Sequence, residues 1–166
     1  MILGMSTSTF TLLHTAISLI GIATGIIVLI AMFGSKRVEG WTALFLLTTV
    51  LTSVTGFFFH SASFGPPHVV GVLSLLLLAV AISALYFFHL VGAWRWLYVA
   101  TAVTALYFNV FVLVAQAFDK VPALKALAPT QLEPPFLVAQ LVVMAIFVAL
   151  GIVAVRGFHP EMATRA

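Results

Sequence analysis

The chain contains no cysteine among its 166 residues. Without thiols it can form no disulfide, no Cys-ligated zinc site and no iron–sulfur cluster. Charge is also scarce, because Asp, Glu, Lys and Arg together make up only 7% of the residues. A soluble domain carries about 25% charged residues, so this chain cannot cover a surface that faces water. The composition therefore predicts an integral membrane protein and gives no sign of a nucleic-acid partner.

The long apolar runs contain no Asp, Glu, Lys or Arg. This absence excludes a Ser-His-Asp triad inside a span, and the chain has no HExxH motif and no dinucleotide fingerprint. A helix needs about 20 mostly apolar residues to cross a bilayer, and in lipid it must satisfy its own backbone. We expect an all-α membrane protein, with residues 1–166 as one transmembrane domain and five helices in an up-and-down bundle. The expected spans are 10–33, 41–60, 69–90, 96–117 and 136–155.

Lys and Arg are distributed unevenly between the two expected sides of the membrane. One side carries Lys36, Arg37, Arg95, Arg156 and Arg165, and the other carries Lys120 and Lys125. Because Lys and Arg concentrate in cytoplasmic loops, we expect the N-terminus outside and the C-terminus inside. The beginning of the chain lacks the basic segment of a signal peptide. We therefore expect a retained first span and a location in a bacterial inner membrane.

The connection over residues 118–135 is the longest loop. Pro122 and Pro129 enclose the sequence ALKALA, a run of good helix formers. One interpretation is a short helix at the membrane interface, and the other is an irregular loop held by prolines.

Two pairs of spans resemble each other. His68 follows His14 by 54 positions, and Trp96 follows Trp41 by 55 positions, each near the beginning of a span. This pattern predicts that spans 1–2 and 3–4 are parallel repeats, although two apolar hairpins also align by chance.

Three of the five histidines fall on the expected outer side, namely His14, His60 and His68. An ionisable group near hydrocarbon is costly and often marks a functional site, and imidazole binds zinc, copper, nickel and iron. One hypothesis is a transition-metal site formed by all three residues. A second is haem b ligated by His14 and His68, since helices 1 and 3 of a four-helix bundle are diagonal neighbours. The third is that the histidines are structural and hold no cofactor.

Glycines accompany two of these histidines. Gly21 and Gly25 follow His14 by seven and eleven positions, and Gly71 follows His68 by three, which places each on the face of its histidine. Small residues there would let a porphyrin approach the backbone. The same GIATG pattern is also typical of close helix–helix packing, so both interpretations stay open.

The fourth expected span is the most polar. Tyr107, Asn109 and Gln116 lie in it, and Gln140 lies in the fifth. These side chains would line a pocket for a small polar group or a quinone carbonyl. The alternative is that they form hydrogen bonds between helices, worth about 0.6 kcal/mol on average.

The segment YFNVFVLVAQAFDKVPALKALAPTQLEPPF, residues 107–136, resembles a signature of small bacterial five-span membrane proteins whose activity is uncharacterised. The resemblance implies the five-span layout and no activity. Histidines at span ends are more loosely similar to four-helix b-type cytochromes. The leading hypothesis is an outer-side histidine cluster that binds haem b or a transition metal for redox or sensing. The alternatives are a non-catalytic scaffold, bound to other membrane subunits or to copies of itself, and a small-solute carrier. All three have the lipid bilayer as a partner.

Overall fold

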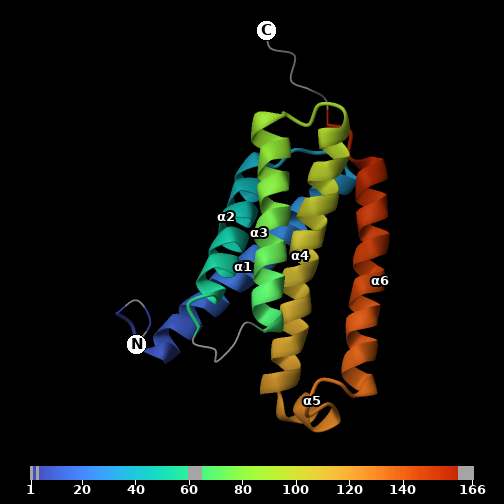
Figure 1. The fold of residues 1–166 in the computed structure, drawn as a ribbon. Coiled ribbons are helices and arrows are strands. Elements are labelled where there is room, and N and C mark those ends of the chain that lie inside the picture. Colours follow the sequence, from blue (N-terminus) through green and yellow to red (C-terminus); the bar gives the residue numbers. More distant parts are fainter. Residues whose placement is uncertain (1, 3, 60–64, 161–166) are drawn as a thin grey trace.

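The computed structural model describes residues 2, 4–59 and 65–160. Within them the chain forms six α-helices and one π-helical turn, η1. In Figure 1 the long helices run alternately up and down. We call the end at which α1 ends and α2 begins the upper end, and the opposite end the lower end. The elements are α1 (Thr7–Phe33), α2 (Glu39–Gly56), α3 (Pro66–Ile82), η1 (Ser83–Phe87), α4 (Ala93–Lys120), α5 (Pro122–Leu127) and α6 (Pro134–Gly157).

Four helical segments are long and apolar enough to cross a membrane: α1, α3 with η1, α4 and α6. Each overlaps one of the spans expected from the sequence, so the predictions of an all-helical protein and of these four candidate spans are confirmed. The span expected at 41–60 corresponds to α2, which has 18 residues and ends at Gly56. α2 is not among these four candidates, and its 18 residues include Glu39 and a series of Thr and Ser residues.

The short helix expected between Pro122 and Pro129 is confirmed as α5. Its Leu124 packs against a small cluster formed by Phe118, Ala128 and Phe136. Its Lys125 forms an exposed ion pair with Asp119 at the end of α4, with 3.1 Å between Nζ and Oδ1. Figure 1 shows α5 lying across the lower end, between the ends of α4 and α6.

Local sequence explains where the helices begin. The Ser6 hydroxyl accepts a hydrogen bond from the Thr9 amide and caps α1. Pro66 and Pro134 stand in the first turns of α3 and α6, where a missing amide hydrogen costs nothing.

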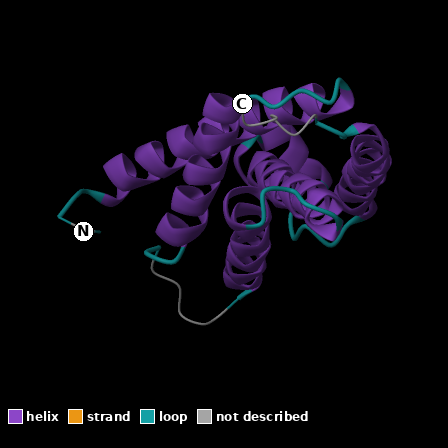
Figure 2. Cartoon of the chain, turned by 90° about the horizontal axis from the view of Figure 1, so that it is seen from above, coloured by secondary structure: helices purple, strands orange, loops and turns teal. Residues whose placement is uncertain are grey.

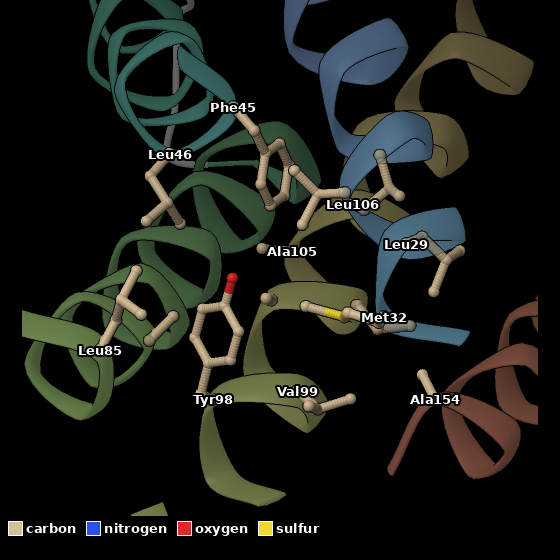
Figure 3. Packing of buried hydrophobic residues seen from close by; sticks show 14 of the residues in the cluster. Leu29, Met32, Phe45, Leu46, Leu85, Tyr98, Val99, Ala105, Leu106 and Ala154 are labelled. Atoms are coloured by element: carbon tan, nitrogen blue, oxygen red, sulfur yellow. The ribbon is translucent and has the colours of Figure 1, made fainter. Parts of the chain in front are cut away.

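The main core lies between α1, α2, α3 and α4. Figure 3 shows side chains from these helices meeting around Phe45 and Leu106, with Ala154 of α6 at the edge. Gly25 of α1 lies directly against this core. A Cβ atom there would lie 2.6 Å from Leu106 Cδ1 and 2.8 Å from Phe45 Cε2. Glycine thus lets α1 approach α2 and α4 more closely than any other residue would.

The helices differ in how they pack. Seen from above in Figure 2, the described residues are helices and loops, and α1 lies obliquely to the others. α6 stands beside α4 at the edge of the bundle in Figure 1 and buries only Phe136, Gln140 and Ala154. Its upper end is held by Arg95, whose Nη1 donates to the carbonyl oxygens of Val155 at 3.0 Å and Phe158 at 2.6 Å. One guanidinium therefore fixes the end of a helix that has little other burial.

Candidate functional site

His14 lies near the lower end of α1 and contacts the end of α2. Its Nδ1 is 2.7 Å from the hydroxyl oxygen of Thr55, and its ring meets the Phe59 ring edge-on with centroids 5.1 Å apart. The Thr55 hydroxyl donates its one proton to the carbonyl of Leu51, at 2.6 Å. His14 Nδ1 must therefore carry the hydrogen in the contact with Thr55, which leaves a lone pair on Nε2.

His68 has the opposite arrangement at the beginning of α3. The backbone amide of Gly65 donates to His68 Nδ1 at 3.2 Å, so this nitrogen is an acceptor. In a neutral imidazole the hydrogen then lies on Nε2. The ring also packs against Phe57, with centroids 5.8 Å apart. His68 thus acts as a helix cap, and its neutral form offers no free lone pair to an iron or another metal.

The remaining parts of the expected haem or metal site are placed as follows. His60 lies outside the described residues. Within those residues no group of three or more His, Asp or Glu side chains could hold a metal ion. The space beside each glycine is occupied by side chains: Thr48 and Thr49 at Gly21, Phe45 and Leu106 at Gly25, and Phe57 at Gly71. These glycines serve helix packing, and the outer-side cofactor stays a prediction.

The polar residues of α4 and α6 point in different directions. Asn109 is buried toward α1 and α2, and its Nδ2 donates to the Thr49 hydroxyl at 3.3 Å. Tyr107 faces α6, with its ring centroid 5.8 Å from that of Phe147. Gln140 donates from Nε2 to the Phe111 carbonyl at 3.1 Å, while Gln116 is exposed. Asn109 and Gln140 therefore bond between helices, and the four side chains do not converge on one point.

A pocket that the sequence did not suggest opens at the upper end. Its volume is about 240 Å³, and we call it the upper pocket. Residues from α1, α2, η1, α4 and the connecting loops surround it. They are Val28, Met32, Lys36, Arg37, Val38, Glu39, Thr42, Leu85, Tyr86, His89, Tyr98 and Phe158.

The wall of the upper pocket changes character with depth. Two hydroxyl groups lie inside, because Tyr98 is 2% exposed and Thr42 is 6% exposed. Figure 3 shows the Tyr98 oxygen directed into the core rather than toward solvent. Lys36 and Arg37 are exposed at the rim, where Arg37 Nη2 lies 3.1 Å from Glu39 Oε1. The pocket therefore combines an apolar wall, two internal hydroxyls and a rim with two cations and one carboxylate.

The backbone beside the upper pocket is irregular. η1 forms a π-helical turn closed by the Phe88 amide on the Ser83 carbonyl at 3.0 Å. Directly after it, His89 and Leu90 adopt left-handed conformations, with φ of 47° and 62°. Such turns and such backbone conformations are uncommon and cluster at functional sites. They turn the chain sharply enough to bring Tyr86 and His89 to the same pocket.

Comparisons of this chain with known protein families, curated proteins and solved structures give no match. Among the sites described above, the upper pocket is the one that joins a cavity, buried polar groups and an irregular backbone.

Proposed function

We propose that this protein binds a small amphiphilic anion, such as a carboxylate with a short apolar tail, in the upper pocket. The observation that carries the proposal is the pocket wall itself. Cations stand at the rim and hydroxyls inside, while apolar side chains cover most of the remaining surface. Ligand sites in proteins typically share this pattern of apolar lining with a few convergent polar groups.

The charge at the rim favours an anion. Lys36 and Arg37 outnumber Glu39 there, and the guanidinium of Arg37 matches a carboxylate in geometry. The wall farther from the rim, with Val28 and Leu85, favours an apolar tail. The ligand would therefore enter with its tail first and keep its acidic group near the water.

The size of the pocket limits the ligand. At about 240 Å³ the pocket lies below the range of about 300–1,000 Å³ that is typical of sites for drug-sized ligands. We therefore expect a small ligand, and a six-carbon carboxylate is a probe of this size class.

The packing below the upper pocket supports binding rather than passage across the membrane. Phe45 and Leu106 are each 1% exposed and close the bundle beneath the pocket. Gly25 lets α1 seal this region against both side chains. A solute carrier would have to separate these groups at every cycle, whereas a binding or sensing protein would not.

Thermal unfolding of the purified protein in mild detergent tests the proposal, with sodium hexanoate and 1-hexanol as probes. A ligand that binds only the folded state raises the melting temperature as its concentration exceeds Kd. We expect hexanoate to stabilise the protein more than hexanol. Substituting both rim cations, Lys36→Gln with Arg37→Gln, should weaken hexanoate binding about tenfold, because each exposed charge contributes up to about 1 kcal/mol. Hexanol binding should not change.

The matched control carries the Lys120→Gln and Lys125→Gln substitutions at the lower end. It removes the same number of cations, one of them also in an exposed ion pair, and should bind hexanoate as the wild type does. Tyr98→Phe removes one internal hydroxyl without changing the shape of the wall. Equal loss of hexanoate binding in the rim variant and in the control would refute a specific role for the upper pocket, and so would no binding by the wild type.

We also propose that α2 crosses the membrane, which gives five spans in the inner membrane of a bacterium. Three hydroxyls of α2 are bonded within the helix itself: Thr48, Thr49 and Ser53 donate to carbonyls four residues earlier, at 2.7, 2.7 and 2.9 Å. Its exposed side chains Leu47 and Leu51 are apolar. The uneven Lys and Arg distribution supports an upper end in the cytoplasm.

A metal or haem iron held by His14 is a second candidate function. One observation favours it, namely that the Thr55 contact leaves the Nε2 lone pair of His14 free of its own hydrogen. A hydrogen-bonded Nδ1 is the usual arrangement in a metal-bound imidazole. Visible spectra of oxidised and reduced protein, with metal analysis, test this candidate. A cofactor signal that His14→Ala abolishes would support it, and a blank sample after haem and metal supplementation would exclude it.

A further inference from the structure

A groove of about 460 Å³ runs between α4 and α6, separate from the upper pocket. Its lining is apolar apart from three residues, Thr104, Tyr107 and Arg156. The complete lining is Ala100, Val103, Thr104, Tyr107, Met144, Phe147, Val148, Gly151, Ile152, Val155 and Arg156. We propose that this groove binds one acyl chain of a membrane phospholipid, with the phosphate of that lipid at Arg156.

Small residues on both helices line the groove, namely Ala100 on α4 and Gly151 on α6. A Cβ atom at Gly151 would meet only Val103 Cγ1, at 3.6 Å, which is an ordinary contact. Space is therefore left open at the periphery of the bundle, beside α6, which buries few of its residues.

The length of the groove matches one leaflet of a bilayer. Its lining on α6 runs from Met144 to Arg156, and at 1.5 Å per residue this distance is about 18 Å. Half of the hydrocarbon core of a bilayer measures about 15 Å. An acyl chain lying in the groove would thus reach from the middle of the membrane to the headgroup level.

The groups at the upper end of the groove suit a phosphate. Arg156 is exposed in the last turn of α6, and Arg95 holds the carbonyl of the neighbouring Val155 at 3.0 Å. Arginine recognises phosphate through several donors in one plane. Trp96, one helical turn above Ala100 on the same face of α4, is 46% exposed. Tryptophan is enriched at the headgroup level of membranes.

An apolar groove inside a bilayer has three possible occupants: lipid, a second copy of the chain, or another membrane protein. The position of the cation decides among them. A helix from another protein would have to present apolar side chains along the whole groove and an acidic side chain opposite Arg156. A phospholipid presents hydrocarbon along the groove and one negative charge at the level of Arg156. We therefore commit to the phospholipid.

Native mass spectrometry of the purified chain in mild detergent tests this proposal, with phosphatidylglycerol and the uncharged diacylglycerol as probes. We expect one phosphatidylglycerol to stay bound at collision energies that remove diacylglycerol. Gly151→Leu fills the groove and should reduce the retained phospholipid at least tenfold. Arg156→Gln should lower the preference for phosphatidylglycerol over diacylglycerol about three- to fivefold.

Two control variants separate the groove from general effects. Ala149→Leu adds a similar side chain on an exposed part of α6 that is not in the lining, and should retain lipid as the wild type does. Lys125→Gln removes a cation at the lower end and should leave the preference unchanged. Equal retention by wild type and Gly151→Leu would overturn the proposal. A dimer that Gly151→Leu converts to a monomer would overturn it as well, because a second copy would then be the occupant.

Discussion

Gly25 offers a sensitive test of the packing between α1, α2 and α4. In Gly25→Ala the new methyl group would lie within 3.0 Å of three atoms belonging to Leu106 and Phe45. Both of these side chains are 1% exposed and cannot turn away. Overpacking of this kind costs about 3 kcal/mol at the upper end of its range, while the gain in helix propensity from glycine to alanine is about 1 kcal/mol. We expect a net loss of about 2 kcal/mol.

The matched variant is Gly151→Ala, in the middle of α6. It makes the same chemical change in a helix interior, but its methyl group meets only Val103 Cγ1 at 3.6 Å. The propensity gain should therefore dominate, and this variant should be up to about 1 kcal/mol more stable than the wild type. The two glycines thus predict effects of opposite sign for one substitution.

Titration of the purified protein with sodium dodecyl sulfate in mixed micelles measures both effects, with helix content and tryptophan fluorescence as signals. The free energies of unfolding of Gly25→Ala and Gly151→Ala should differ by about 3 kcal/mol. This comparison between two variants does not require the stability of the wild type. Stability of Gly25→Ala equal to or above that of the wild type would refute the close approach of α1 to Phe45 and Leu106.

Two further predictions concern the ends of α6. Arg95→Ala removes two charged hydrogen bonds to backbone carbonyls and should lower the free energy of unfolding by about 2 kcal/mol in the same titration. Lys125→Ala breaks only an exposed ion pair and should lower it by less than about 1 kcal/mol. Equal losses in the two variants would contradict the role of Arg95 in holding the end of α6. At the other end, the pKa of Glu133 is lowered from 4.5, mainly because the Thr130 hydroxyl donates to its carboxylate at 2.8 Å. The contribution of this carboxylate to stability is present above pH 4.5 and is lost as the pH falls through the lowered pKa. The Thr130 and Leu132 amides donate to this carboxylate. As the pH falls, their hydrogen exchange should therefore accelerate in the wild type relative to the Glu133→Gln variant. Identical pH profiles of exchange in the two proteins would argue against these hydrogen bonds.

Much of the fold follows from simple sequence patterns. Apolar length predicted five spans, and four of them correspond to helical segments that are long and apolar enough to cross a membrane. The helix formers between Pro122 and Pro129 predicted α5. The end of α2 was not predictable in the same way, because the aromatic residues Phe57–Phe59 continue the apolar run after the helix has stopped at Gly56. Hydropathy detects the apolar run and does not detect where the backbone leaves the helix.

The upper pocket could not be read from the sequence, because its parts are far apart in the chain. In the sequence Lys36 and Arg37 indicate only the orientation of the chain in the membrane, and nothing connects them with His89. Tyr98 is polar and lies in an apolar span, which was the one available signal. Only the packing of α1, α2 and α4 shows that these residues surround one space. In the same way, the glycine face of α1 was compatible with a porphyrin until the neighbouring side chains were placed.

The π-helical turn also bears on the history of the chain. A π turn holds one residue more than an α-helical turn, and η1 occupies Ser83–Phe87, between His68 and Trp96. Over this same interval the spacing between the similar spans grows from 54 positions, for His14 and His68, to 55 positions, for Trp41 and Trp96. The offset is still 54 positions at the end of the π turn, because α1 ends at Phe33 and η1 ends at Phe87. If the hairpin was duplicated, an alignment of the two halves should therefore place its one-residue gap after η1, before Trp96, and the π turn would not be the mark of an inserted residue.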